Sequence, residues 1–333
     1  MAIRNMELAK LSLDTFNGVT VKFNNATGED AIRNALVQSV GGEWSFYNFM
    51  DNRGKFFQVL TDVLALPVQK TIEGMFDGLV DFENIALGDK KVFDVENVDL
   101  FKVATIASGN LDIRRQRLYS RQIEVATSKL GIKIYEDFDR FIAGRINWST
   151  LIEKVRKSLS LATSEKIYEC LMTNYTSAST NYCKTGTFDE KVLDQMIARV
   201  EAKTGMKCAI YGTKTALAKV SGATSINTVV GASDALKNDY ANLGYFKNYK
   251  GTAMVELPTI LKVGTDEFAF SSDDLFILPI GEKLIKVVYE GDPEIYDIQD
   301  ASRRNDEQIE FFFGQKMGVV CLLAGYFGIY RLQ

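Results

Sequence analysis

Apolar positions recur at helical spacing in the middle of the chain. The segment Thr150-Leu-Ile-Glu153 matches a capping box, in which the Thr hydroxyl and the Glu carboxylate satisfy the first backbone amides of a helix. Apolar residues then follow every three or four positions as far as Tyr175. The pattern predicts one helix from Thr150 to about Thr176, roughly 39 Å long, which is either a core helix of a large domain or a strut across a flat one.

The preceding segment shows the alternation and β-branched content of strands. Phe101–Ala107 and Gln122–Thr127 read as strands, and Ser108–Asp112 between them is rich in turn residues. The pattern predicts a long β-hairpin. Because an isolated two-stranded hairpin is at best marginally stable in water, we expect this one to lie against a partner.

The return arm of this hairpin is strongly basic. It carries Arg114, Arg115, Arg117 and Arg121 within Ile113–Arg121. Two interpretations stay open with equal weight: a solvated face, or a patch that pairs with carboxylates of a neighbouring subunit through bidentate arginine contacts.

Short helices and strands alternate in the second half of the chain. Helices are predicted after a second capping box, Thr187-Phe-Asp-Glu190, with an end at Gly205, and again at Lys214–Val220 and Asp234–Leu243. Strands are predicted at Cys208–Tyr211, Thr252–Leu257, Leu275–Leu278 and Leu284–Tyr289. This arrangement indicates a compact α/β domain. Glu294–Ile298 and the apolar run that ends at Tyr330 are expected to complete a sheet beside the long helix.

The first 80 residues are more irregular. A helix is predicted over residues 29–40, ended by Gly41-Gly42, and another from Phe56 to Leu64, closed by Pro67. The first twenty-five residues have few periodic apolar positions. They are interpreted either as an arm that a partner orders or as a frayed terminus.

Composition excludes several classes of protein. The 333 residues carry a net charge of −4, which argues against a protein that binds nucleic acid by neutralising phosphates. The chain has no histidine, so histidine-based triads and most catalytic zinc sites are ruled out. Its four cysteines form no Cys-x-x-Cys pair and are expected to be small buried side chains. We expect no signal peptide, because residues 1–10 are polar and mixed in charge. We expect no membrane span, because the longest apolar run, Met317–Tyr330, is too short.

Sequence patterns of catalysis and cofactor binding are absent. The chain has no phosphate-binding loop, no dinucleotide-binding glycine motif and no nucleophile elbow. Asp266, Glu267, Asp273 and Asp274 cluster on a predicted loop without calcium-loop spacing, so a solvated acidic loop is the favoured interpretation over a metal site. We expect no cofactor and no enzymatic activity.

The order of these parts resembles the Hong Kong 97-type capsid fold of tailed-bacteriophage major capsid proteins. Short segments that resemble the family are Cys208–Thr213, Leu243–Thr252 followed by Val255–Pro258, and Asp274–Lys283 followed by Ile285–Asp292. The resemblance implies an α+β fold in five parts. They are an N-terminal arm and the start of the peripheral domain (1–83), an extended hairpin loop (84–135), the peripheral domain with its spine helix (136–185), an axial domain (186–290), and a return to the peripheral domain (291–333).

The resemblance also implies a function: a subunit that assembles with itself into hexamers and pentamers of an icosahedral shell around DNA. It implies a separate scaffolding protein and a portal protein as partners, a location in the virion, and assembly in the host cytoplasm. Two alternatives stay open, an encapsulin-like nanocompartment shell and an α/β enzyme that uses lysine or carboxylate chemistry.

Overall fold

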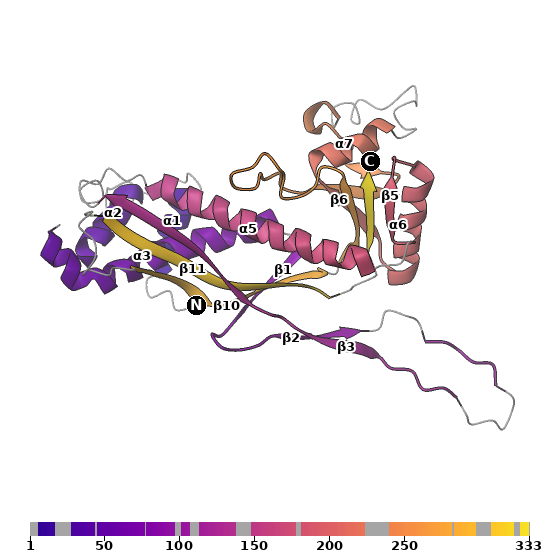
Figure 1. Ribbon diagram of the computed structural model, residues 1–333, viewed down its shortest axis with the longest axis horizontal. Coiled ribbons are helices and arrows are strands. Elements are labelled where there is room, and N and C mark those ends of the chain that lie inside the picture. Colours follow the sequence, from indigo (N-terminus) through magenta and orange to yellow (C-terminus); the bar gives the residue numbers. More distant parts are fainter. Residues whose placement is uncertain are drawn as a thin grey trace.

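The chain folds into two bodies joined by the spine helix, with a long hairpin projecting from their junction (Figure 1). The computed structural model describes residues 6–16, 28–43, 45–76, 78–96, 101–106, 113–137, 148–177, 181–223, 240–281, 283–297, 308–322 and 327–332. The body on the left of Figure 1 is called the peripheral body, and the one at the upper right the axial body.

The peripheral body is a four-stranded sheet covered on one side by long helices. The sheet order is β1-β10-β11-β4, in which β1 is parallel to β10 and the other pairs are antiparallel. Helices α3 and α5 pack against it and against each other. The bounds are β1 Val80–Ile85, β4 Ser128–Asp137, β10 Ile285–Asp297, β11 Gln308–Cys321, α3 Phe46–Met75 and α5 Trp148–Ser177.

Helix α3 corrects the prediction of a short helix closed by Pro67. It has 30 residues and continues through position 67. A proline inside a helix costs roughly 3 kcal/mol because it removes a backbone hydrogen bond. Buried apolar side chains lie both before Pro67, such as Leu60 and Val63, and after it, such as Val68 and Ile72. Packing on both sides therefore outweighs the local cost.

The N-terminal segment also differs from a free arm in its described part. Helix α1 (Met6–Phe16) packs against α3 of the same chain. Leu8 and Leu11 are buried, and the Ser12 hydroxyl donates to the Val63 carbonyl at 2.8 Å. Helix α2 (Gly28–Ser39), which confirms the predicted helix, completes this group. Residues 1–5 and 17–27 lie outside the described part of the chain.

The axial body is a six-stranded sheet with two helices packed against it. The strand order is β5-β12-β9-β6-β8-β7. Helices α6 and α7 contact its strands. The bounds are β5 Cys183–Gly186, β6 Cys208–Gly212, β7 Asn248–Tyr249, β8 Thr252–Glu256, β9 Asp274–Pro279, β12 Gly328–Leu332, α6 Glu190–Thr204 and α7 Lys214–Ala223.

The last strand corrects the expected course of the C-terminal segment. Strand β11 does lie beside α5, as expected. The predicted strand Leu284–Tyr289 was assigned to the α/β domain, but it is the first half of β10, which pairs with β1 and β11 in the peripheral sheet. The last strand, β12, pairs with β9 and β5 in the axial sheet. The apolar run before Tyr330 is therefore shared between two sheets, which a one-dimensional pattern does not reveal. The predicted boundary at residue 290 falls inside β10, and the domain division stays a prediction.

Helix ends confirm part of the sequence reasoning. Gly205 ends α6 with φ 70°, and its N–H donates to the Glu201 carbonyl at 2.8 Å, as the glycine predicts. The two capping boxes are wrong in detail. Helix α5 begins at Trp148, which places Thr150 inside the helix, and Asp189 caps α6 in place of Thr187. Of the predicted helix Asp234–Leu243, only residues 240–243 are described, and they form a helical turn.

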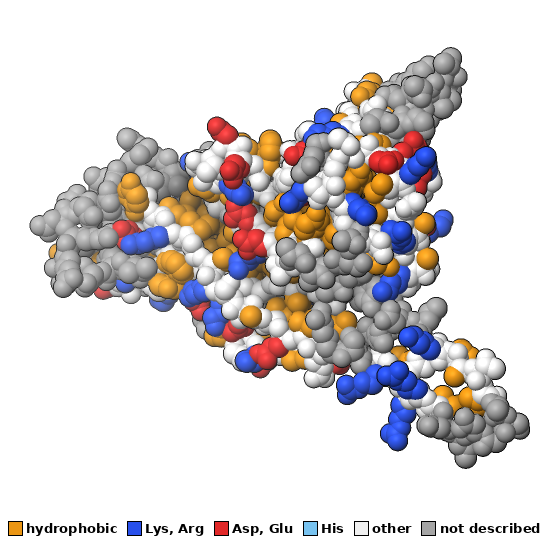
Figure 2. Space-filling view, turned by 45° about the vertical axis from the view of Figure 1, so that its right-hand side comes forward, with side chains coloured by type: hydrophobic (Ala, Val, Ile, Leu, Met, Phe, Trp, Pro, Cys, Tyr) orange, Lys and Arg blue, Asp and Glu red, His pale blue; other side chains and the backbone are white. Residues whose placement is uncertain are grey.

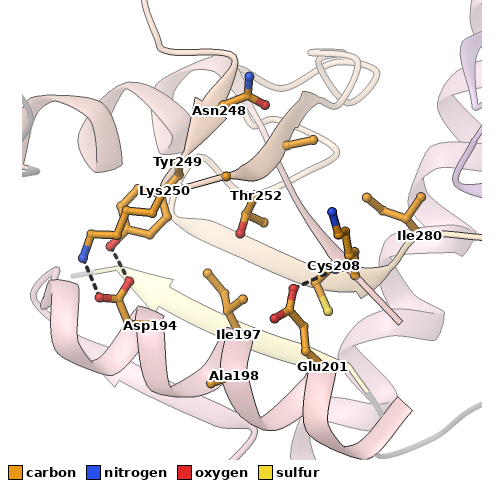
Figure 3. Close-up of a pocket in the computed structure, with 13 residues that line it drawn as sticks. Asp194, Ile197, Ala198, Glu201, Cys208, Asn248, Tyr249, Lys250, Thr252 and Ile280 are labelled. Carbon is orange, nitrogen blue, oxygen red and sulfur yellow. Dashed lines mark hydrogen bonds and ion pairs between the residues drawn. The ribbon is translucent and has the colours of Figure 1, made fainter. Parts of the chain in front are cut away.

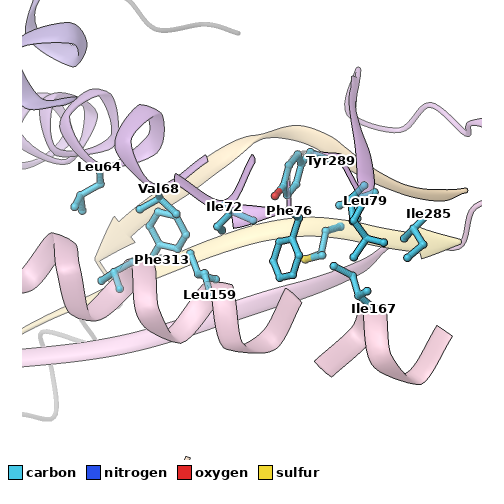
Figure 4. Packing of buried hydrophobic residues seen from close by; sticks show 14 of the residues in the cluster. Leu64, Val68, Ile72, Phe76, Leu79, Leu159, Ile167, Ile285, Tyr289 and Phe313 are labelled. Atoms are coloured by element: carbon cyan, nitrogen blue, oxygen red, sulfur yellow. The ribbon is translucent and has the colours of Figure 1, made fainter. Parts of the chain in front are cut away.

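One hydrophobic core runs through the peripheral body into the axial sheet. Figure 4 shows Leu159 and Ile167 of α5 facing Phe76 at the end of α3, with Tyr289 of β10 and Phe313 of β11 beside them. The same cluster includes buried side chains of the axial sheet: Ala209, Tyr211, Phe276, Leu278 and Ile329. The two bodies therefore share packed side chains and hold a fixed relation to each other.

Candidate assembly surface

The projecting hairpin is built from β2 and β3. Val92–Glu96 pairs antiparallel with Tyr119–Glu124, with a register shift between Val95 and Glu96. Beyond this ladder, residues 101–106 and 113–118 continue outward without strand pairing. The prediction of a hairpin holds in outline, but the predicted strand Phe101–Ala107 is wrong in its described part.

A side chain replaces the missing ladder along the outer arms. The Lys102 N–H donates to the Gln116 side-chain oxygen at 2.7 Å, and the Gln116 amide donates to the Lys102 carbonyl at 2.9 Å. One glutamine thus holds the two arms together without a sheet. Because few backbone hydrogen bonds fix the conformation of the outer arms, a neighbouring molecule can change that conformation when it binds.

The outer arms expose apolar side chains to water. Those at least 45% exposed are Phe101, Val103, Ile106, Ile113 and Leu118. Val103 is 97% exposed, which leaves nearly its whole hydrophobic surface uncovered. Burying each of these side chains in an interface contributes on the order of 1 kcal/mol to the free energy of association.

The predicted arginines lie on this same surface. Arg114, Arg115 and Arg117 are exposed, and among the described residues none of them has an acidic partner within ion-pair distance. Arg121 lies in β3 opposite Val95, and its side chain lies outside the described part. Figure 2 shows the blue Lys and Arg side chains gathered along the hairpin next to orange apolar ones. The assembly role of all four arginines stays a prediction.

A buried carboxylate fixes the base of the hairpin to the central sheet. Glu290 of β10 accepts from the Gly88 N–H at 3.1 Å, from the Thr127 hydroxyl and from the Lys316 amine at 2.9 Å. Gly88 and Thr127 lie on the two legs of the hairpin. These hydrogen bonds, with the charge of Lys316, lower the pKa of Glu290 to about 2, so it is ionised at neutral pH. We call Glu290 with these three partners the hairpin clasp.

A second projection was missed from the sequence. Residues 260–269 form a small hairpin, here called the axial finger, which leaves the axial body above α5 in Figure 1. It exposes Leu261, Val263 and Phe268. Of its residues, the sequence pattern drew attention only to the two acidic ones, Asp266 and Glu267. Three large apolar residues around Gly264 in a turn-rich loop were the available signal.

The other acidic residues of that predicted loop have structural partners. Asp274 is fully buried and accepts from Arg331 Nε at 2.8 Å and from the Tyr168 hydroxyl at 2.7 Å. Asp273 forms an ion pair with Lys219 on the surface. Asp273 and Asp274 therefore belong to two separate ion pairs next to the finger, and not to one acidic cluster.

A pocket of about 390 Å³ in the axial body bears on the enzyme alternative. Figure 3 shows it between α6 and the β7–β8 turn, with Lys250 and Tyr249 reaching Asp194. Lys250 donates to Asp194 at 2.5 Å and pairs with Glu190 at 2.8 Å, and these carboxylates raise the lysine pKa. A nucleophilic or basic lysine needs the opposite shift.

The same pocket contains a protonated thiol and a strained turn. Burial and the nearby Glu201 raise the pKa of Cys208 to about 12, which opposes thiolate chemistry. Lys250 has φ 46° and Gly251 φ 90°, the left-handed pair that a two-residue hairpin turn requires. The lysine ion pairs therefore serve to tie this turn to α6, and the pocket gives no support to lysine or carboxylate catalysis.

The described residues contain no group of three or more Cys, Asp or Glu side chains arranged to hold a metal ion. Among them, no helix is both long enough and apolar enough to cross a membrane.

Comparison with known proteins decides the family. A family model described as "SPbeta prophage-derived putative capsid protein YonB" matches residues 8–330, nearly the whole chain. The chain belongs to this family of capsid proteins. It is a structural protein of the virion capsid that assembles with copies of itself.

Solved structures confirm the predicted fold. The capsid of cyanophage P-SCSP1u matches with TM-score 0.52 and 11% identity, over 78% of this chain and 88% of that one. The mature capsid of bacteriophage PhiM1 matches with TM-score 0.51 and 9% identity, over 78% and 86%. At these identities the likeness establishes the α+β Hong Kong 97-type fold alone.

The encapsulin alternative gains less from the comparisons. The SrpI encapsulin of Synechococcus elongatus matches with TM-score 0.45 and 10% identity, over 76% of this chain and 85% of that one. That score is too low to argue from. No curated protein matches the capsid protein.

Proposed function

We propose that this capsid protein closes into hexamers and pentamers of an icosahedral shell that encloses a DNA genome. The observation that carries the proposal is the projecting hairpin. In its described part it exposes five large apolar side chains and three arginines without an acidic partner among the described residues, and the bonds described between it and the rest of its subunit lie at its base. An element of this kind gains stability when it lies across an adjacent subunit.

The charge of the chain fits a shell that encloses DNA without gripping it. A net charge of −4 does not favour tight phosphate contacts, so packaged DNA stays free to move during filling and release. We further propose that a separate scaffolding protein guides assembly in the host cytoplasm and that a portal protein occupies one vertex.

Expression of the chain, alone and with its scaffolding protein, tests this proposal. Electron microscopy and light scattering are expected to show closed particles, sheets or capsomer rings. Particles that hold DNA after packaging support the phage shell, whereas particles that enclose a protein cargo without DNA support the encapsulin alternative. A clean monomer or dimer in both conditions refutes a shell function.

The triple variant R114E/R115E/R117E tests the role of the hairpin within that shell. We expect a folded subunit that no longer assembles, because the basic arm then repels the acidic surface it would meet. The matched control R114K/R115K/R117K keeps the charge and is expected to assemble. Normal yields of closed particles from the Glu variant would contradict an intersubunit role.

A further inference from the structure

The axial finger has a firm root and an uncovered tip. The Ala269 N–H donates to the Ile260 carbonyl and the Lys262 N–H to the Glu267 carbonyl, each at 2.8 Å. At the root, Phe270 is 1% exposed and its ring meets Tyr168 of α5 edge-on, with 5.9 Å between centroids. The finger is thus held in one shape before any partner arrives, which lowers the entropy cost of binding.

The surface of the finger is apolar and acidic. Val263 is 81% exposed, and Leu261 and Phe268 are exposed beside it. Glu267 forms an ion pair with Lys262, while Asp266 has no ion-pair partner among the described residues. Nothing in the described part of the same chain covers this surface.

The outer arms of the projecting hairpin carry the complementary character. Residues 101–106 and 113–118 contain Lys102 and three arginines and no acidic residue. Their exposed apolar side chains stand between these charges, as they do on the finger. The two surfaces are therefore both apolar, and their charges are opposite in sign.

Within one subunit these two surfaces cannot meet. In Figure 1 the hairpin leaves the body below β1 and β10, and the finger leaves it above α5. Complementary patches on opposite sides of one subunit form a head-to-tail contact between copies, and such contacts close into rings.

We propose that the axial finger is the receiving surface for the hairpin arms of an adjacent subunit. The assignment rests on the proposed shell function and names the contact that closes each capsomer. Val263 and its apolar neighbours cover the exposed side chains of the arms, and Asp266 and Glu267 face the arginines.

A charge exchange tests the pairing. The variant R114E/R115E/R117E is expected to lose assembly, and D266K/E267K in the same chain is expected to restore it. Two exposed ion pairs lost per contact correspond to about tenfold weaker association of neighbours, and repulsion adds to the loss. As a matched control, E43K/D51K places the same charge changes on exposed acids of the N-terminal region and is expected to restore nothing.

Thiol cross-linking tests the proximity directly. In assembled particles of V103C/V263C, a short bis-maleimide is expected to join subunits into a ladder of covalent oligomers. Burial raises the pKa of Cys170 to about 11 and of Cys208 to about 12, and Cys321 is buried, so these three thiols compete little. The wild-type particle, which keeps the partly exposed Cys183, measures the remaining background. The single variants V103C and V263C serve as controls and are expected to give no ladder.

The outcomes separate this inference from the proposed function. Particles that form normally, with no ladder and no rescue by D266K/E267K, would overturn the finger as receiving surface while leaving the shell intact. If the wild-type chain forms no particles with its scaffolding protein, the shell function itself fails. A ladder together with the specific rescue supports both.

Discussion

The buried carboxylate of Asp274 is predicted to be the strongest single polar tie between the spine helix and the axial sheet. Asp274 begins β9 and is 0% exposed. It accepts from Arg331 of β12 at 2.8 and 3.1 Å, and from the Tyr168 hydroxyl of α5 at 2.7 Å. Its loss therefore disturbs two strands and a helix at once.

The size of the effect follows from these partners. Removing one member of a buried ion pair costs roughly 3–5 kcal/mol, because the other charge stays unpaired. The Arg331 side chain is 35% exposed, so water partly replaces the carboxylate. We expect D274A to lower the free energy of unfolding by about 3 kcal/mol, at the lower end of that range.

The neighbouring aspartate offers a matched control. Asp273 pairs with Lys219, and both side chains are more than 40% exposed. D273A is therefore expected to cost at most about 1 kcal/mol. Y168F removes one hydrogen bond to the carboxylate of this ion pair and is expected to cost roughly 1.5–3 kcal/mol.

Urea denaturation of unassembled subunits, followed by circular dichroism, measures all three variants. Equal midpoints and slopes for D274A and D273A would refute the reasoning, because burial would then add nothing to the ion pair. A change in slope without a change in midpoint would indicate an altered unfolded state.

Three further predictions concern the hairpin base and the cysteines. Because the folded-state pKa of Glu290 is lowered to about 2, its contribution to stability is complete above about pH 4.5 and is lost as the pH falls toward 2. Over this range, the free energy of unfolding, measured by denaturation at each pH, should fall more steeply with decreasing pH in the wild type than in E290Q. A Cβ at Gly318 would lie 2.6 Å from the carbonyl oxygen of Ala126, which is on one leg of the hairpin. G318A is therefore expected to lower the free energy of unfolding by roughly 1–3 kcal/mol and to displace that leg. Denaturation measures the first effect, and proteolysis of the hairpin measures the second. Cys170 and Cys208, whose thiol pKa values burial raises to about 11 and 12, are expected to react with a thiol reagent at pH 8 only after urea is added; fast labelling of the native protein would contradict their burial.

The sequence predicted elements whose signals are local. Residues 28–39 and 214–223 are helices close to the predicted bounds, and β6 and β9 coincide with short apolar runs. In each of these elements, the spacing of apolar residues, the residues at the ends and the tertiary packing all favour the same secondary structure. The order of such elements was enough to identify the fold, which the comparisons confirm.

The errors arise where distant packing decides. Pro67 ends a helix by local rules, yet α3 continues through it because apolar side chains on both sides are buried in one core. β-Branched residues at 101–106 favour a strand, but strand structure needs a paired neighbour, and a glutamine side chain spans the gap there. The finger has no decisive local signature, because apolar residues scattered in a turn-rich loop can be buried or exposed, and only the folded chain shows that Leu261, Val263 and Phe268 are exposed.

The capsid protein combines a rigid body with an element held at one end. A continuous core and the Asp274 tie fix the axial and peripheral bodies to each other, while the hairpin is joined to them through the clasp at Glu290 and a short ladder. If the hairpin lies on a neighbouring subunit, as proposed, the rigid body would set the angle between neighbours, and the weakly held arm would follow a neighbour whose position differs between rings of five and six. Strengthening the arm's own ladder would therefore be expected to favour one ring size over the other.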